Sequence, residues 1–266
     1  MRTITKEDYT DISIDDFYVN WMCEKDIPYR DNPEDEYMRE RCKLDAYFPI
    51  DRNGVPALVF FHGGGLTAGS KEALKDHWKL LGCAIFSANY RLSPKVKCPE
   101  YMRDAAAAAA WVKRNASRFN ADPNNVFVCG ASAGAYLTSV LCTMPKYLAE
   151  FGCRPEDFRG YMPISGEMIT HFTIRAERGI PNTVQIVDEF APLSHVRPDM
   201  PPLLMVTGET GKEIDCRPAD NKLMRDALLF CGNKTAEYYE LPNLTHSTVW
   251  NAAVPYMLDF IKKHLK

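Results

Sequence analysis

Three short stretches of the sequence carry residues that together could break an ester or amide bond. Ser132 lies in GASAG at 130–134, an HGGG stretch begins at His62, and His246 lies in NLTHS at 243–247. A serine hydroxyl becomes a nucleophile when a nearby histidine accepts its proton. The pattern therefore predicts nucleophilic catalysis, with Ser132 as the nucleophile and His246 as the base.

The small residues around Ser132 have a steric reason. Where a strand turns at once into a helix, the positions two before and two after the serine come close together, so glycine suits 130 and 134. Such a turn exposes the serine hydroxyl and leaves the amide of Ala133 at a helix N-terminus, where it can donate to a developing oxyanion. The glycines at 63–65 let a second loop bring further amides to the same point.

Alternating strands and helices are predicted along the chain. Continuous apolar runs such as PALVFFHGG at 56–64 are typical of strands buried on both faces. The predicted strands are 42–49, 56–64, 83–90, 126–130, 159–166, 201–208 and 235–242. The predicted helices are about 70–80, 100–119, 133–144, 217–231 and 251–265. This order predicts a mostly parallel sheet with helices on both faces, and such a sheet places its site at the carboxyl ends of the strands. All three stretches follow a predicted strand.

A single α/β domain over residues 1–266 is expected, because no repeat or low-complexity linker divides the chain. Residues 1–40 are charged and aromatic, and they are expected to form an N-terminal extension or cap segment. Residues 167–198 hold several prolines and charges, and they are expected to form an irregular cap or pocket insertion. Five aromatic residues of the extension either cover the site or only pack against the body: Tyr9, Phe17, Tyr18, Trp21 and Tyr29.

Composition gives no reason to expect nucleic acid or an anionic membrane surface as a partner, since the net charge is −3. No apolar run reaches the roughly 18 residues of a membrane-spanning helix. The nine cysteines form no CxxC pair and no zinc-ligand spacing with the six histidines. No metal and no organic cofactor is expected. The polar, acidic start contains no signal-peptide core, so a reduced, cytoplasmic protein is expected.

The sequence resembles the hormone-sensitive-lipase-like branch of the α/β-hydrolases, and more narrowly the carboxylesterases and carbohydrate esterases of feruloyl or acetyl-xylan type. The stretches that carry the resemblance are HGGGLTAGSK, SANYRLSP, PEYMRDAAAAAAWV, VFVCGASAGAYL, DEFAPLSHV and PPLLMVTGE. The resemblance implies an α/β-hydrolase fold with a small cap. It also implies Ser132 as nucleophile, His246 as base, and an oxyanion hole formed by the amides of Gly63, Gly64 and Ala133.

Three residues of one loop could supply the acid that would complete a triad. The family places it three residues beyond the glycine that ends the strand at 201–208, and here that position is Gly211. The loop offers Glu209, Glu213 and Asp215. By resemblance to family loops of the form GDRELE, Glu213 is the first choice and Asp215 the alternative.

Other polar residues are interpreted as structural. His62 is expected to support the glycine loop, and Asp104 to hold a loop through Arg91. Asp188 and Glu189 either line the pocket mouth or start a helix. The remaining histidines are interpreted as surface or packing residues: His77, His171, His195 and His264.

The function expected from these residues is hydrolysis of short-chain carboxylic esters through an acyl-enzyme, with a small ester as the partner molecule. By resemblance, the ester could be an acyl group on a sugar. Two alternatives remain open. A non-catalytic ligand-binding protein of the same fold is favoured by Gly211. A serine peptidase of the same fold usually carries a further large domain. A homo-oligomer also remains open.

Overall fold

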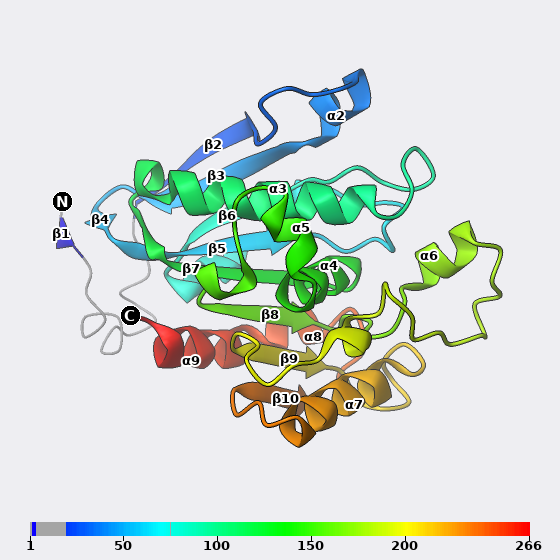
Figure 1. Ribbon diagram of the computed structural model, residues 1–266. Coiled ribbons are helices and arrows are strands. Elements are labelled where there is room, and N and C mark those ends of the chain that lie inside the picture. Colours follow the sequence, from blue (N-terminus) through cyan, green and yellow to red (C-terminus); the bar gives the residue numbers. More distant parts are fainter. Residues whose placement is uncertain (1, 4–19, 75) are drawn as a thin grey trace.

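An eight-stranded sheet forms the centre of the protein (Figure 1). The computed structural model describes residues 2–3, 20–74 and 76–266. The strand order across the sheet is β10-β9-β8-β7-β5-β6-β3-β2. In chain order the strands are β2 (Trp21–Pro28), β3 (Lys43–Pro49), β5 (Val55–Phe61), β6 (Ala84–Ala88), β7 (Ala121–Ala131), β8 (Gly160–Ile164), β9 (Leu203–Thr207) and β10 (Ala236–Glu240). The strands from β10 to β6 are parallel, and β3 runs antiparallel to both β6 and β2. The predicted mostly parallel sheet is confirmed.

The middle strands are buried on both faces, as their apolar runs predicted. Every residue of β5 is buried, and so is every residue of β6, β8 and β9. Successive side chains of a strand point to opposite faces. Val59 and Phe61 accordingly belong to one hydrophobic cluster, and Leu58 and Phe60 to another. The sheet therefore separates two cores.

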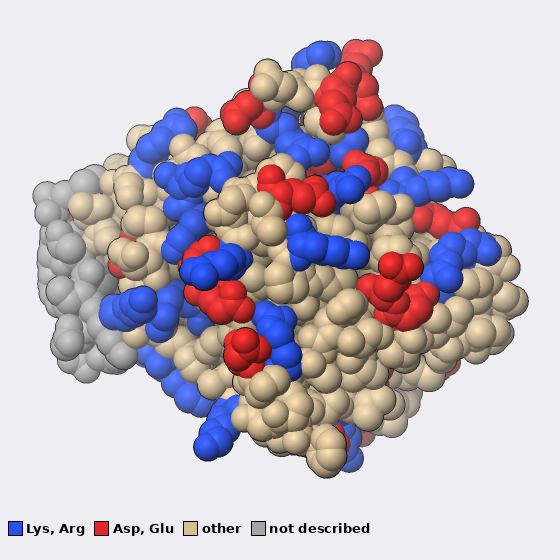
Figure 2. Space-filling model, in the orientation of Figure 1, with Lys and Arg blue, Asp and Glu red and all other residues tan. Residues whose placement is uncertain are grey.

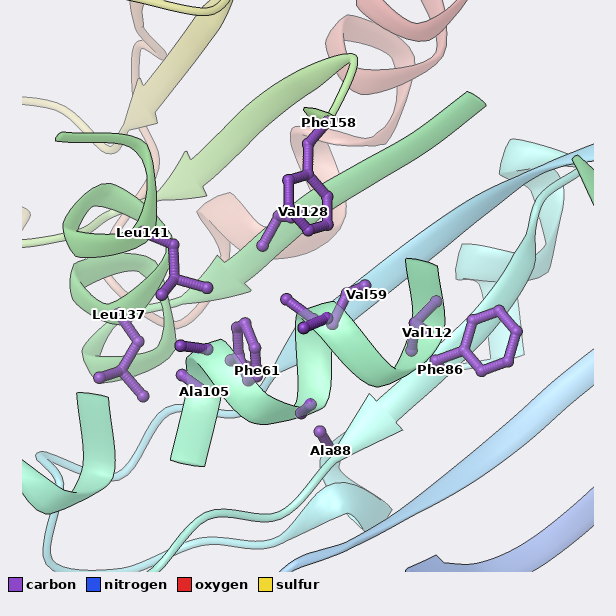
Figure 3. Close-up of a cluster of buried hydrophobic side chains, with 14 of the residues drawn as sticks. Val59, Phe61, Phe86, Ala88, Ala105, Val112, Val128, Leu137, Leu141 and Phe158 are labelled. Atoms are coloured by element: carbon purple, nitrogen blue, oxygen red, sulfur yellow. The ribbon is translucent and has the colours of Figure 1, made fainter. Parts of the chain in front are cut away.

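Helices cover both faces. Helices α3 (Glu100–Asn115), α4 (Ala133–Thr143) and α7 (Arg217–Phe230) contribute to the first core, where Figure 3 shows Leu137 and Leu141 of α4 packed with strand residues. Helix α9 (Val254–His264) contributes Met257, Phe260 and Ile261 to the second core. The six alanines at 105–110 are all buried in the first core, where their small side chains let α3 pack closely.

The remaining elements are short. They are the strands β1 (Arg2–Thr3) and β4 (Arg52–Asn53), which pair with each other, and the helices α2 (Glu36–Arg41), α5 (Pro145–Ala149), α6 (Phe172–Glu177) and α8 (Val249–Ala252). The 3₁₀ helices are η2 (Lys71–Ala73), η3 (Asp76–Leu81), η4 (Ala116–Phe119), η5 (Pro155–Asp157) and η6 (Pro192–His195).

Two internal segments differ from the predicted elements. The helix expected at about 70–80 is two 3₁₀ helices, because Leu74 leaves helical geometry with ψ of 130°. The segment 167–198, expected to be irregular, contains α6 and η6. In Figure 1, α6 lies beyond the edge of the sheet toward which the parallel strands point.

The N-terminal segment joins the sheet. Residues 21–28 form β2, the edge strand beside β3, whereas the expectation was a segment that packs across the body. Tyr29 is buried and donates a hydrogen bond to the carbonyl of Asn89 at 2.7 Å, so it has a packing role. Tyr9, Phe17 and Tyr18 lie outside the described residues. The assignment of the chain to one domain stays a prediction.

On the face shown in Figure 2, basic and acidic side chains are intermixed. Within residues 2–3, 20–74 and 76–266, no helix is both long enough and apolar enough to cross a membrane.

Candidate active site

Ser132 stands at the sharp turn between β7 and α4. Its backbone has φ of 56° and ψ of −117°, outside both helix and strand geometry, and its amide donates to the carbonyl of Ile164 at 2.9 Å. A non-glycine residue with positive φ is uncommon and costs free energy, so the surrounding structure must hold it in place. The strand and the helix on either side of Ser132 are buried along their length near the turn, which supplies that constraint.

The glycines on either side of Ser132 make the turn sterically possible. A Cβ atom at Gly130 would lie 2.3 Å from the backbone of Gly134. A Cβ atom at Gly134 would lie 2.0 Å from the carbonyl oxygen of Phe61, in the neighbouring strand β5. Both distances are far below van der Waals contact, and both obstacles are backbone atoms. The steric reason predicted from the spacing is therefore confirmed.

The Gly134→Ala substitution is expected to lower the free energy of unfolding by about 3 kcal/mol or more, because the new methyl group must displace the backbone of β5. Alanine in a helix is otherwise favoured over glycine by about 1 kcal/mol, so a loss would come from the collision alone. Urea unfolding followed by circular dichroism measures the change. Gly152→Ala is the control, since its Cβ meets open space and costs only the about 1–2 kcal/mol of its left-handed backbone. Equal losses for the two variants would contradict the collision.

His246 meets Ser132 from the loop after β10. The histidine Nε2 lies 2.9 Å from the Ser132 Oγ. The loop is braced by Thr245, whose amide donates to the Thr248 hydroxyl at 2.9 Å. The ring also meets Trp250 edge to face, with 5.7 Å between centroids. The hydroxyl of Ser132 can thus transfer its proton directly to a ring nitrogen of His246.

Glu213 holds the other side of the His246 ring. Its Oε1 lies 2.6 Å from His246 Nδ1 and also accepts from the Ile214 amide at 2.8 Å. Burial acts to raise the pKa of the Glu213 carboxyl, but hydrogen bonds from His246, Ser165 and Ile214 outweigh it and lower the pKa to about 2. A carboxylate at this position fixes the ring with a proton on Nδ1, which leaves Nε2 free to accept from Ser132.

The loop geometry explains why the acid stands two residues later than the expected position. The amides of Lys212 and Glu213 both donate to the carbonyl of Glu209 at 2.9 Å, which closes a helical turn. Gly211 occupies this turn with φ of 86°. The turn aims Glu213 at His246, whereas Asp215 is exposed and the Glu209 carboxylate pairs with Lys212 at 2.9 Å. Of the three candidate acids, the structure brings only Glu213 to His246.

Ser165 is a member of the site that sequence reasoning missed. Its hydroxyl donates to Glu213 Oε2 at 2.6 Å, and its oxygen lies 2.9 Å from His246 Nδ1. Ser165 directly follows β8 and has φ of 56°. A small polar residue just after a predicted parallel strand was the available signal, since that is where the other three stretches lie.

The glycine loop lies directly against the Ser132 turn. A Cβ atom at Gly63 would be 3.2 Å from the Cβ of Ser132, and one at Gly64 would be 2.2 Å from the carbonyl oxygen of Ala68. Gly64 also has φ of 111°. Ala133 is the first residue of α4, where helix geometry leaves the amide without an intrahelical acceptor. The two segments whose amides were predicted to form the oxyanion hole, the glycine loop and the start of α4, therefore both adjoin Ser132.

His62 supports this loop, as predicted. Its ring stacks on Tyr90 with 4.3 Å between centroids, and its Nδ1 lies 2.7 Å from the carbonyl oxygen of Gly63. Burial lowers the pKa of His62 to about 4, so the ring is neutral near pH 7. Arg41 Nη2 lies 3.4 Å from His62 Nε2 and can only donate. The proton of the neutral ring is therefore on Nδ1, bonded to Gly63.

The other polar residues named from the sequence have structural contacts. Asp104 accepts two side-chain hydrogen bonds from Arg91, at 2.8 and 2.9 Å, as predicted. Asp188 accepts from the Phe190 amide and from Thr170, which fixes the chain ahead of η6. The side chain of His77 lies outside the described part.

The other three histidines make structural contacts. His171 is buried and caps α6, and His195 contacts the carbonyl of Glu189. His264 packs against Phe260. Among the residues placed by the structure, no group of three or more histidine, cysteine, aspartate or glutamate side chains is arranged to hold a metal ion.

Comparisons with known proteins agree with this geometry. Residues 58–166 match a family described as having the alpha/beta hydrolase fold. Esterase LipQ of Mycobacterium tuberculosis is 28% identical over 215 residues, which cover 73% of this chain and 50% of LipQ. Carboxylesterase NlhH of the same species is 26% identical over 144 residues, which cover 53% of this chain and 42% of NlhH. The chain thus spans about half the length of the curated relatives it matches.

Two solved structures extend the likeness over most of the chain. A truncated carbohydrate esterase from gut microbiota superimposes with a TM-score of 0.72 at 18% identity, covering 91% of this chain and 96% of that one. An esterase from Pyrobaculum calidifontis superimposes with a TM-score of 0.69 at 24% identity, covering 91% of this chain and 85% of that one. The protein therefore has the α/β-hydrolase fold, and these relatives are esterases.

Proposed function

We propose that the protein is a serine carboxylesterase. One observation carries the proposal: an unbroken line of contacts from Ser132 Oγ through His246 to the Glu213 carboxylate, with spacings of 2.9 and 2.6 Å. These are the distances at which a proton can pass from a serine to a histidine that a carboxylate holds. The esterase names of the relatives support the same class of reaction.

In the proposed reaction, Ser132 Oγ attacks the ester carbonyl carbon while its proton moves to His246 Nε2. The amides of Gly63, Gly64 and Ala133 stabilise the negative charge that develops on the carbonyl oxygen. His246 then donates the proton to the departing alcohol, which leaves the acyl group on Ser132. A water molecule that gives a proton to His246 attacks this acyl-enzyme, and His246 passes that proton to Ser132 Oγ as the acid leaves.

The experiment is hydrolysis of p-nitrophenyl acetate and p-nitrophenyl butyrate by the purified protein. Serine-dependent turnover of either ester supports the proposal, and its absence would overturn it. The ligand-binding alternative was favoured by glycine at 211, and the position of Glu213 removes that reason. Hydrolysis of short acyl groups, including acyl groups on sugars, is part of the proposal.

The state of the cysteines supports a proposal about the cellular compartment. All nine cysteines are free thiols, and Cys23 and Cys216 are exposed. Free exposed thiols persist in a reducing environment. We therefore assign the protein to the cytoplasm, as the sequence predicted.

Ser165 is proposed as a positioning residue. The Ser165→Ala variant is expected to show a kcat about tenfold lower with little change in KM, because Glu213 and the His246 ring both lose a hydrogen-bond partner. Steady-state kinetics on p-nitrophenyl butyrate measure the two constants separately. Ser139→Ala is the matched control, since Ser139 is also buried but only bonds the Ala135 carbonyl within α4. A rise in KM alone, or the same loss in both variants, would contradict the positioning role.

A further inference from the structure

A polar cavity lies beside the loop that carries Glu213. Its volume is about 270 Å³. The wall is built by helix α6, by the start of helix α7 and by the loop between Glu213 and α7. The lining residues include Phe172, Arg175, Ile214, Arg217 and Asp220.

The cavity lies against two loops of the candidate active site, the glycine loop and the loop that carries Glu213. On one side, Phe172 packs against the glycine loop, since a Cβ atom at Gly65 would lie 2.9 Å from its ring. Thr173 Oγ1 also donates to the carbonyl of Gly65. On the other side, Ile214 follows Glu213 directly and donates its amide to that carboxylate. The cavity wall therefore adjoins both the glycine loop and the loop that carries Glu213.

Arg217 is the lining residue whose guanidinium keeps hydrogen-bond donors that no described acceptor meets. The side chain is buried, with only 3% of its surface exposed, and one Nη atom donates to the carbonyl of Ser165. In the described part of the chain, no carboxylate oxygen lies within 4.0 Å of its guanidinium, and no other acceptor meets its remaining donors. A guanidinium carries five N–H donors, and a buried charge without a partner is costly.

The two buried carboxylates nearby are already engaged by other donors. Glu167 pairs with Arg175 at 3.1 Å. Asp220 accepts from the amide of Met168 at 3.1 Å and from the Asn221 side chain at 2.7 Å. Burial raises the pKa of Asp220 to about 7, so near neutral pH this group carries only part of a negative charge. Burial raises the pKa of both Glu167 and Asp220 and the nearby charge of Arg217 acts to lower it, but neither carboxylate is hydrogen-bonded to the guanidinium.

We propose that the cavity is a carboxylate-binding subsite and that Arg217 binds an acid group carried by the ester substrate. This inference rests on the proposed esterase function and names its substrate class, namely esters whose acyl or alcohol part ends in a carboxylate. A planar guanidinium binds a carboxylate through two parallel hydrogen bonds. A neutral polyol could accept from the same donors, but an anion also gains the attraction of the guanidinium charge, so an anion is the better partner.

Two matched pairs of esters test the substrate class. In the first pair, mono-(4-nitrophenyl) glutarate carries a carboxylate on its acyl part, and 4-nitrophenyl pentanoate is the neutral counterpart. In the second pair, 3-acetoxybenzoate carries the carboxylate on its alcohol part, and 3-acetoxybenzamide is the neutral counterpart. We expect a higher kcat/KM for the anionic member of at least one pair, and a fall of about tenfold or more in that preference in Arg217→Gln. Arg217→Lys, which keeps the charge but not the planar fork, is expected to retain part of it.

Arg217 also bonds the Ser165 carbonyl, so its replacement could impair catalysis in general. Such an effect lowers kcat/KM for both esters of a pair and leaves the ratio of the two values unchanged. Arg225→Gln is the control, since Arg225 lies on the same helix and pairs with Asp226 at 2.6 Å. Its ratio is expected to equal that of the wild type. An unchanged ratio in Arg217→Gln, or no anionic preference in either pair, would overturn the proposal.

Binding without turnover separates this proposal from the esterase function. Calorimetric titration with glutarate, and with neutral glutaramide for comparison, measures the affinity of the cavity for each ligand even if no ester is hydrolysed. We expect glutarate to bind more tightly than glutaramide to the wild type, and Arg217→Gln to lose the difference. If Ser132-dependent hydrolysis is absent but glutarate binds through Arg217, only the esterase function fails. Equal binding of the two ligands would overturn the anion site.

Discussion

Replacement of Ser132 by alanine is expected to lower kcat for p-nitrophenyl acetate by roughly 10⁶-fold, the scale on which loss of a nucleophile acts in serine hydrolases. Alanine keeps the Cβ atom, so the strained backbone with φ of 56° is unchanged and only the hydroxyl that faces His246 is removed. The amides of the two flanking segments remain. Binding of substrate is therefore expected to persist while turnover is lost, as separate measurements of kcat and KM would show.

Two further measurements make the result decisive. The melting temperature of Ser132→Ala should match the wild type, because the hydroxyl makes no contact that holds the fold other than the one with His246. An acyl-enzyme should also be trapped on Ser132 of the wild type by mass spectrometry at low pH. If the alanine variant keeps the wild-type rate, Ser132 is not the nucleophile and the proposed serine-esterase mechanism is wrong.

Most of the sheet and the two central site residues could be predicted from the sequence, for one physical reason. The strands that carry HGGG and GASAG are buried on both faces, so they appear as continuous apolar runs that end at the functional loops. The strand β2 could not be predicted in this way. It lies at the edge of the sheet with mostly exposed side chains, so its sequence holds charges rather than an apolar run.

The parts of the site that were not predicted depend on contacts between distant residues. Ser165 meets Glu213 and His246 across sequence separations of 48 and 81 residues, and nothing in the local sequence YMPISG encodes those partners. The role proposed for Arg217 likewise could not be predicted, because it depends on burial beside α6, a helix more than 40 residues earlier in the chain. The choice between Glu213 and Asp215 was open for the same reason, because it depends on one turn of the loop.

The Glu213→Gln substitution is expected to lower kcat by about 10⁴-fold, whereas Asp215→Asn should leave it within about twofold. Glutamine preserves the size of the side chain but removes the charge that stabilises the His246 imidazolium, and its amide group can present a donor to Nδ1 in place of an acceptor. Asp215 is exposed and serves as the matched control on the same loop. A larger loss in the Asp215 variant would mean that the loop rearranges when substrate binds.

The pH dependence of the Glu213 variant separates a charge effect from a folding effect. Because the native pKa of Glu213 is about 2 against 4.5 for a free carboxyl, the group favours the folded state fully above about pH 4.5. That stabilisation is lost as the pH falls toward 2. Glu213→Gln should therefore be less stable than the wild type near neutral pH, with the gap narrowing in acid. Its loss of kcat should stay nearly constant between about pH 8 and 9, where the native carboxylate is ionised and which lies above the range in which histidines usually titrate. A loss of kcat that varies across this range would show that Glu213 does not act as a fixed charge.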